Sequence, residues 1–244
     1  MEQLIIPQYY VTLSLVALHV AATILKVKRG TFILLLFAFI SSLLSMVFII
    51  HTSGHPPVSG NFEKLQCFVF YLLLIALLAQ IFMSKEKGQL RFFSIPALII
   101  IILPLFSEMK LSEHYIIYEK AEVVLFFQMR LISMALFAFS ISCSLEALFL
   151  RLKDSESGYF IHLGRNFCLL GAAAFLSGEF FGSLWALDGW GDPWRWSNSF
   201  FTAGAMFLLS MLAGHIPAHY LKNNLMRIIF PAIPLVIIIV SYLT

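Results

Sequence analysis

Long apolar runs recur along the whole 244-residue chain, and they constrain its fold more than any other feature. Hydrophobic residues make up 60% of the sequence and charged residues only 12%, whereas soluble domains usually carry about 25% charged residues. A helix needs about 20 predominantly apolar residues to cross the hydrocarbon core of a bilayer. The sequence therefore predicts an all-α fold, a polytopic transmembrane bundle, and it argues against a soluble domain.

Eight segments approach the length of a membrane span, and we expect them to form a single transmembrane domain over residues 1–244. The fourth segment is short and contains Pro96 and Pro104, while the fifth is long enough to project beyond the bilayer. The first twenty residues lack the basic region and the cleavage site of a signal peptide, so they are expected to remain as the first span. The expected spans are 8–27, 31–51, 64–83, 91–107, 121–150, 166–187, 198–220 and 226–243.

The positions of lysine and arginine predict the orientation of these spans. Eleven of the sixteen basic residues lie in alternate loops or at the span ends beside them, between spans one and two, three and four, five and six, and seven and eight. The positive-inside rule assigns these loops to the cytoplasm. Both termini and the loops 52–63, 108–120 and 188–197 are therefore expected on the extracytoplasmic side.

Several function classes have no support in the sequence. The basic residues are spread over short loops and form no patch, so no nucleic-acid partner is expected. Cys67, Cys143 and Cys168 stand singly in apolar segments, and the chain has neither a C-x-x-C redox motif nor a C-x-x-C-H haem attachment motif. It also lacks the glycine-rich motifs that bind nucleotides or dinucleotides.

All four tryptophans fall within twelve positions, at Trp185 and in the stretch WGDPWRWS that covers 190–197. Gly191 and Pro193 predict a turn within this stretch. One interpretation is an aromatic belt at the membrane boundary, where indole rings meet both lipid and water. The other is a platform on which indoles stack against a flat macrocycle while Arg195 pairs with a carboxylate. The two interpretations have about equal support from composition.

Two stretches resemble a known family. SLWALDGWGDPWRWSNSFF, residues 183–201, resembles the tryptophan-rich WWD motif of the CcsA/CcmC/CcmF-type proteins that handle haem in cytochrome c biogenesis, with Trp185, Trp190, Trp194 and Trp196 in register. SGHPPVSGNFEKL, residues 53–65, resembles a second segment of CcsA proteins and includes His55 and Glu63.

This resemblance implies an eight-span protein of the bacterial inner membrane or an organelle equivalent, with the tryptophan-rich loop outside. It implies non-covalent haem b, presented near that loop for attachment to apocytochrome c, and a CcsB/ResB-like membrane partner. At most, the chain would be one component of a cytochrome c haem lyase complex.

The histidines are the candidate ligands of haem iron. His215 lies in the expected span 198–220, where the family places a transmembrane haem ligand, and it is the first candidate. His19, in the first expected span, is equally compatible with a second axial ligand and with a side chain that bonds a neighbouring carbonyl. His55 belongs to the second motif, where it either orders the loop or faces the haem pocket, and His114 is more typical of a solvated loop residue.

The sequence departs from the family at three places. Ser197 stands where the motif has aspartate, Arg130 stands in MRLISM where an outer histidine is expected, and no histidine follows in the last outer loop. Arg130 could instead pair with Glu179 or with a haem propionate, while Asp188 and Asp192 are expected to be solvated or paired with Arg195. These departures leave two other functions open: a haem-bearing subunit of a quinone-linked redox complex, and a haem-free membrane scaffold.

Overall fold

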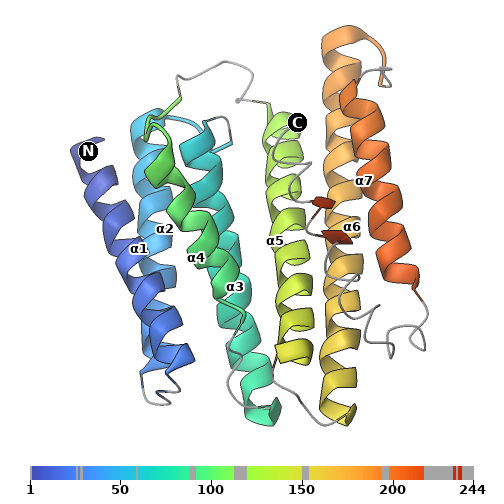
Figure 1. Cartoon of the computed structure of the whole chain (residues 1–244). Coiled ribbons are helices and arrows are strands. Elements are labelled where there is room, and N and C mark those ends of the chain that lie inside the picture. Colours follow the sequence, from blue (N-terminus) through green and yellow to red (C-terminus); the bar gives the residue numbers. More distant parts are fainter. Residues whose placement is uncertain are drawn as a thin grey trace. The chain divides into compact units, whose positions relative to one another are not determined.

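In a computed structural model of the chain, every regular element of the described residues is a helix (Figure 1), which confirms the predicted all-α class. Five of these helices, α1, α2, α3, α5 and α6, are long and apolar enough to cross a membrane, and they indicate an integral membrane protein. The helices are α1 (Glu2–Ile24), α2 (Thr31–Ser53), α3 (Asn61–Lys87), α4 (Ile95–Ile102), the 3-10 helix η1 (Leu103–Phe106), α5 (Ala121–Phe149), α6 (Asp154–Trp190) and α7 (Asn198–His215). The described residues are 2–25, 27, 30–58, 60–87, 92–112, 120–149, 154–193, 198–216, 233–234 and 236–237.

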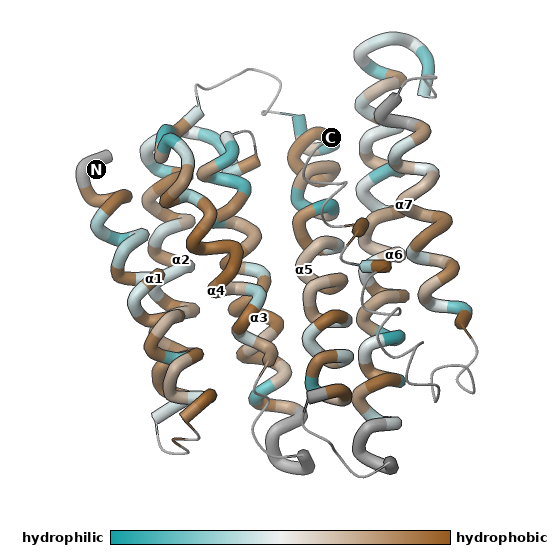
Figure 2. Tube along the Cα trace, in the orientation of Figure 1, coloured by the Kyte–Doolittle hydropathy of each residue, from teal (hydrophilic) through white to brown (hydrophobic). Residues whose placement is uncertain are grey.

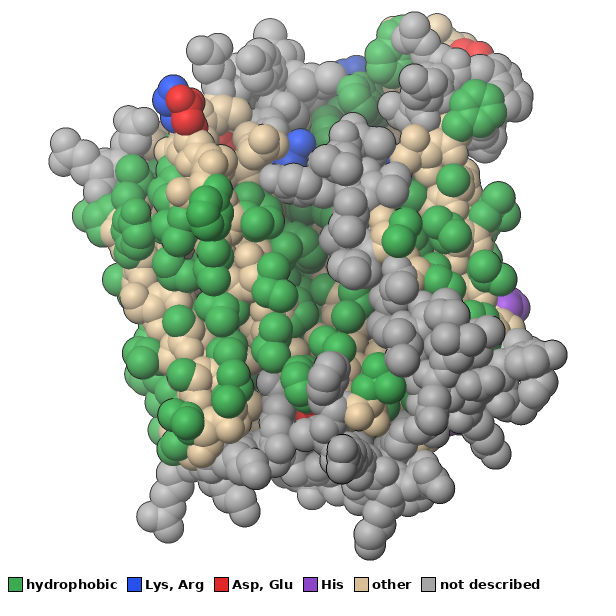
Figure 3. All heavy atoms as spheres, in the orientation of Figure 1, with side chains coloured by type: hydrophobic (Ala, Val, Ile, Leu, Met, Phe, Trp, Pro, Cys, Tyr) green, Lys and Arg blue, Asp and Glu red, His purple; other side chains and the backbone are tan. Residues whose placement is uncertain are grey.

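Apolar side chains cover the helices outside as well as inside. Figure 2 shows hydrophobic residues along the length of each helix, and Figure 3 shows apolar side chains over much of the described surface on the face in view. Leu18, Leu170 and Leu208 are each more than half exposed. A soluble protein rarely exposes continuous apolar surface on this scale, so these side chains are expected to contact lipid.

Residues Met1–Glu119 form one compact unit, in which α2 packs against α1 and α3, while α4 packs against α1 and α3. Glycines with positive φ flank α2: Gly30 at φ 101° precedes it, and Gly54 at φ 73° ends it. The backbone N–H of Gly54 donates to the Ile50 carbonyl at 3.0 Å, which satisfies one of the last acceptors of the helix. This cap defines where α2 ends and where the following loop, residues 54–60, begins.

The fourth expected span, 91–107, was predicted too long. Its α-helical part covers only Ile95–Ile102 and continues as the 3-10 helix η1 to Phe106. Pro104 has no N–H to donate to a carbonyl four residues earlier, so the α-helix gives way to the tighter 3-10 form at this point. These twelve residues are fewer than a membrane crossing requires.

Residues Lys120–Thr244 form the second compact unit, in which α6 packs against both α5 and α7. Glycines on α6 allow a close approach to α5: a Cβ on Gly171 would lie 2.9 Å from the Phe137 ring, and one on Gly182 would lie 2.7 Å from the Phe126 ring. A buried cluster continues from Phe137 through Cys168 to Met206 of α7. Small residues thus set the α5–α6 distance.

The lengths of α6 and α7 differ from the expected spans. α6 begins at Asp154 and has 37 residues, so it is the longest described helix and extends roughly 55 Å, well beyond a bilayer core of about 30 Å. α7 ends at His215 and not at 220, because Ile216 precedes Pro217 and a residue before proline disfavours the helical conformation. Most of the expected eighth span, 226–243, lies outside the described residues, although Ile237 is buried in the cluster with Phe137.

Substitution of Gly171 by alanine should destabilise the second unit. The added methyl group would overlap the buried Phe137 ring, and overpacking of this kind costs about 1–3 kcal/mol. Thermal unfolding of the purified protein in detergent measures the change. Gly189→Ala on the same helix is the control, because its Cβ meets nothing within 4 Å. An unchanged melting temperature for Gly171→Ala would contradict the close packing of α5 on α6.

Candidate functional site

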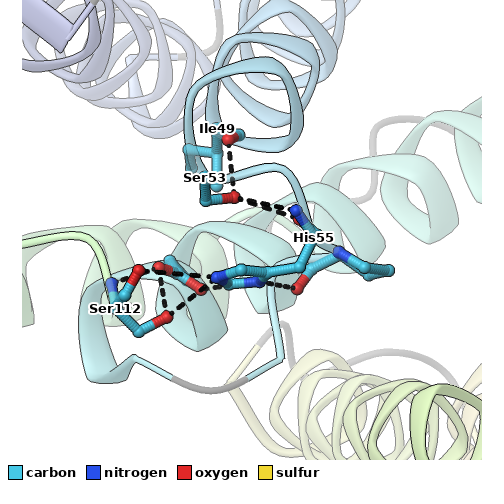
Figure 4. A network of polar contacts seen from close by, with 6 residues as sticks. Ile49, Ser53, His55 and Ser112 are labelled. Carbon is cyan, nitrogen blue, oxygen red and sulfur yellow. Dashed lines mark hydrogen bonds and ion pairs between the residues drawn. The ribbon is translucent and has the colours of Figure 1, made fainter. Parts of the chain in front are cut away.

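A buried polar network joins the loop 54–60, the start of α3 and the segment 107–112 within the first unit (Figure 4). His55 and Glu63 are only 2% and 0% exposed. The Glu63 carboxylate oxygen Oε1 accepts hydrogen bonds from the backbone N–H of Ser112 at 2.7 Å and from its hydroxyl at 2.8 Å. The His55 ring lies on the other side of that hydroxyl, with Nε2 at 3.3 Å.

Both ring nitrogens of His55 have polar contacts within this network. Nδ1 lies 2.8 Å from the Pro56 carbonyl and 4.0 Å from Glu63 Oε2, and Nε2 faces the carbonyl and the hydroxyl of Ser112. Ser53 contacts the same residue, since its hydroxyl lies 3.1 Å from the His55 carbonyl (Figure 4). This geometry favours the loop-ordering role that the sequence left open for His55.

Serine, histidine and glutamate in contact raise the question of nucleophilic catalysis, and the arrangement does not fit it. In a catalytic triad the acid orients the histidine and leaves the serine hydroxyl to attack a substrate. Here the carboxylate accepts from the Ser112 hydroxyl directly, and Nδ1 of His55 is taken by a backbone carbonyl. Ser112 also had no distinguishing sequence pattern, so sequence reasoning missed it.

His19 lies buried on α1 in the same unit. Its Nδ1 is 2.9 Å from the Thr31 carbonyl at the start of α2. A carbonyl only accepts, so this contact requires hydrogen on Nδ1 and leaves Nε2 with its electron pair in the neutral ring. Metal-binding histidines are commonly oriented in this way, but the contact also satisfies the alternative of a carbonyl-bonded side chain.

The described half of the tryptophan-rich motif lies at the end of α6 in the second unit. The Trp185 ring packs against Phe126 of α5, with centroids 5.9 Å apart, and against Trp190 at 5.8 Å. Trp190 is 56% exposed. Gly191 has φ 73° and donates its N–H to the Leu187 carbonyl, which confirms the predicted turn. Trp194, Arg195 and Trp196 lie outside the described residues, as do His114 and His219.

Arg130 forms the pair with Glu179 that the sequence offered as one alternative. Its Nη2 and Nε lie 2.6 and 3.0 Å from Glu179 Oε1, and its guanidinium carbon lies 4.4 Å from the Phe126 ring centroid. The guanidinium charge is thus neutralised between α5 and α6, close to the ring that also supports Trp185. A contact of Arg130 with a haem propionate stays a prediction.

A second ion pair lies near the tryptophans. Lys120, just before α5, donates to Asp188 of α6, and this hydrogen bond together with the carboxylate charge raises the pKa of Lys120. Asp188 is exposed, as one of the two sequence alternatives expected, and it also pairs with Lys120; Arg195, the partner in the other alternative, lies outside the described residues. Both side chains are about half exposed or more, and such pairs contribute little to stability.

His215 is the last residue of α7 and is exposed. Its Nδ1 lies 2.8 Å from the Met211 carbonyl, which again leaves Nε2 as the available nitrogen of a neutral ring. Arg165 of α6 donates from Nη2 to the Gly214 carbonyl at 2.9 Å and thereby holds this end of α7. Trp190 lies roughly 37 Å further along α6 than Arg165, at 1.5 Å per residue. His215 and the tryptophan pair therefore form two separate sites within the second unit.

The hydrogen bonds of His19 and His215 can be compared with those that a haem ligand requires. A neutral imidazole with its second nitrogen bonded to a carbonyl is a suitable axial ligand for iron. Both His19 and His215 meet this requirement, and His215 is also accessible. Among the described residues, no cluster of three or more histidine, cysteine or acidic side chains is arranged to bind a free metal ion.

Removal of one partner of the Arg130–Glu179 pair should destabilise the second unit strongly. Breaking a fully buried ion pair costs roughly 3–5 kcal/mol, and this pair is partly buried, so Glu179→Ala and Arg130→Ala should each cost less than that but still lower the melting temperature in detergent. The double variant should recover a large part of that loss. Lys110→Ala, which breaks the exposed Glu108–Lys110 pair, is the control and should change stability little. Additive losses in the double variant would refute the coupling.

Comparison with known proteins gives no family to which the chain can be assigned. No protein-family model matches the sequence, and no curated protein matches it significantly. The functional interpretation therefore depends on the geometry of the described sites and on the two motif resemblances.

Proposed function

We propose that the protein is a CcsA-like haem-handling integral membrane protein of cytochrome c biogenesis. The observation that carries this proposal is the state of His215, an exposed histidine at the end of an apolar helix whose Nδ1 is already bonded to a carbonyl. When such a ring is neutral, its lone pair is on Nε2, which is the form that binds iron. The proposed cofactor is non-covalent haem b.

In this proposal the two sites of the second unit have different roles. His215 binds iron, with Arg165 holding the end of α7 that carries it, and the second axial ligand, for which His19 is the sequence candidate, stays a prediction. Trp185 and Trp190 offer apolar ring surface at the far end of α6, and Trp194, Trp196 and Arg195 follow in the same motif. Arg130 orients and neutralises Glu179 beside this surface.

The distance between His215 and the tryptophan pair implies a mechanism with two steps. One haem cannot contact His215 and Trp190 together across roughly 37 Å of helix, so capture and presentation are separate events. Haem, when bound, supplies the carbon atoms to which the thiols of apocytochrome c attach. The chain's own residues bind it, exclude water from its faces by indole stacking, and orient its edge toward the extracytoplasmic side.

The proposed partners follow from the same assignment. A CcsB/ResB-like membrane protein would supply the large outer domain that the described residues lack, and apocytochrome c would be the acceptor. The lipid bilayer is the solvent of the apolar helix faces. The expected location is the bacterial inner membrane or an organelle equivalent.

One observation favours the alternatives that dispense with an outer haem. Arg130 stands where the family has an outer histidine ligand, and its guanidinium is committed to Glu179. A haem-bearing subunit of a quinone-linked redox complex would need only the His215 site. A haem-free scaffold would need neither site.

Absorption spectra of the purified protein test the haem site. Protein produced with an adequate haem supply should show a Soret band, and His215→Ala should lose most of it because the iron ligand is gone. His162→Ala, an exposed histidine on α6, is the matched control and should keep the wild-type spectrum. A colourless but folded wild-type protein would exclude both haem-binding functions and leave the scaffold.

Deletion of the gene separates biogenesis from electron transfer. If the protein handles haem for cytochrome c, covalent haem in c-type cytochromes should fall at least tenfold in the deletion strain and return with the wild-type gene. Trp190→Ala should restore it only partly, because the exposed indole at the presentation site is lost. Normal covalent haem in the deletion strain, together with a Soret band, would instead favour the redox subunit.

A further inference from the structure

Two hydrogen-bond donors of Ser112 point at one oxygen of the Glu63 side chain. The Ser112 backbone N–H can only donate, so Oε1 of Glu63 acts as an acceptor at 2.7 Å. The Ser112 hydroxyl is a second donor to the same oxygen at 2.8 Å. Two donors on one oxygen favour the carboxylate over the carboxylic acid. Glu63 is fully buried, so a positive charge next to it stabilises the carboxylate.

The His55 ring can provide that charge. The Pro56 carbonyl at 2.8 Å only accepts, so Nδ1 carries hydrogen in every protonation state compatible with the structure. Nε2 faces two oxygens of Ser112, the carbonyl at 3.5 Å and the hydroxyl at 3.3 Å. When the hydroxyl donates to Glu63, both of these oxygens present lone pairs to Nε2. Hydrogen on Nε2 then satisfies the network, and the ring is an imidazolium 4.0 Å from Glu63 Oε2.

We propose that His55, Ser112 and Glu63 form a buried proton-binding site whose proton fastens the segment 107–112 to the loop 54–60. With the proton bound at Nε2, the Ser112 hydroxyl donates to Glu63 and the imidazolium balances the carboxylate. When the proton leaves for bulk water, the Nε2 lone pair faces the Ser112 oxygens and the hydroxyl turns to donate to Nε2. Glu63 then loses one donor and its nearest imidazolium, so the segment 107–112 is held less firmly. This site does not depend on haem.

Other polar groups of the same unit fit this role. Glu63 Oε2, and both amide atoms of Gln66 one turn further along α3, are buried and have no hydrogen-bond partner among the described residues. Buried polar atoms of this kind are commonly satisfied by internal water, which would give the proton a route to solvent. The first turns of α3 therefore bury polar atoms besides the Glu63 oxygen that accepts from Ser112.

The charged groups of the neighbouring elements do not replace His55. Lys64 follows Glu63 in α3 and interacts with its charge, so it contributes to the balance in both protonation states. Glu108 and Lys110, on the segment itself, pair with each other at 2.6 Å and are more than three-quarters exposed. Tyr9 of α1 donates its hydroxyl to the Ile101 carbonyl, and His51 lies in the last turn of α2.

Hydrogen exchange of the full-length protein in detergent, between pH about 5.5 and 8, tests the proposal, since histidine changes charge in this range. After correction for intrinsic exchange rates, peptides covering 107–112 should exchange at least fivefold faster at the high end, because the proton has left. In Glu63→Gln, the amide oxygen still accepts from Ser112 but needs no counter-charge, so the pH dependence should disappear. Ser112→Ala keeps the backbone bond and loses the hydroxyl, and it should weaken the pH dependence.

Lys110→Gln is the matched control, because it removes a charge from the same segment without touching the buried network. It should keep the wild-type pH dependence. Corrected exchange that is independent of pH in the wild type would overturn the proposal, and so would a wild-type pH dependence in Glu63→Gln. If Glu63→Gln does not fold, Ser112→Ala tests the proposal instead, because it removes only one oxygen atom and is expected to fold. A wild-type pH dependence in Ser112→Ala would then overturn the proposal.

Discussion

The absence of water from the hydrocarbon core is the constraint on which this structure depends. Every backbone N–H and C=O in that layer needs a partner within the protein, and helices provide one for each residue. The same demand extends to side chains: Thr12, Thr23 and Ser142 each donate a hydroxyl to the carbonyl four residues earlier in their own helix. Polar residues can therefore occur along apolar helices without requiring a bound ligand, which is why a buried hydroxyl alone indicates no site.

Charged residues follow the same constraint with a larger penalty. Arg130 and Glu179 face each other across the α5–α6 contact, and the guanidinium also covers the Phe126 ring. The glycines of α6 let the two helices approach closely enough for this contact, since a Cβ added to Gly178 would lie 3.3 Å from the Phe126 carbonyl oxygen of α5. Packing and charge neutralisation thus reinforce each other, and Trp185 rests on the aromatic surface that this arrangement creates.

Sequence reasoning was accurate where one strong local pattern decided the outcome. The apolar runs predicted the helical class, Gly191 predicted the turn after Trp190, and two isolated charges inside apolar segments suggested the Arg130–Glu179 pair. The start of α6 was predicted too late. The polar residues from Asp154 onward were expected to form a loop, but they belong to the first turns of the helix. Ser112 could not be found at all, since its role arises from a tertiary contact 49 positions away from Glu63 in the sequence.

The two motif resemblances have different structural meanings. His55 has one nitrogen on the Pro56 carbonyl and the other on Ser112, so binding iron through either nitrogen would break the contact that joins two loops of the first unit. His215 and Trp190 are placed differently, since the imidazole of one and the indole of the other are both exposed, at positions roughly 37 Å apart along α6. A cofactor role therefore suits the second unit, whereas the histidine motif of the first unit is better explained by loop closure. The resemblance to haem-handling proteins is consequently most useful at the residues whose rings a ligand can reach.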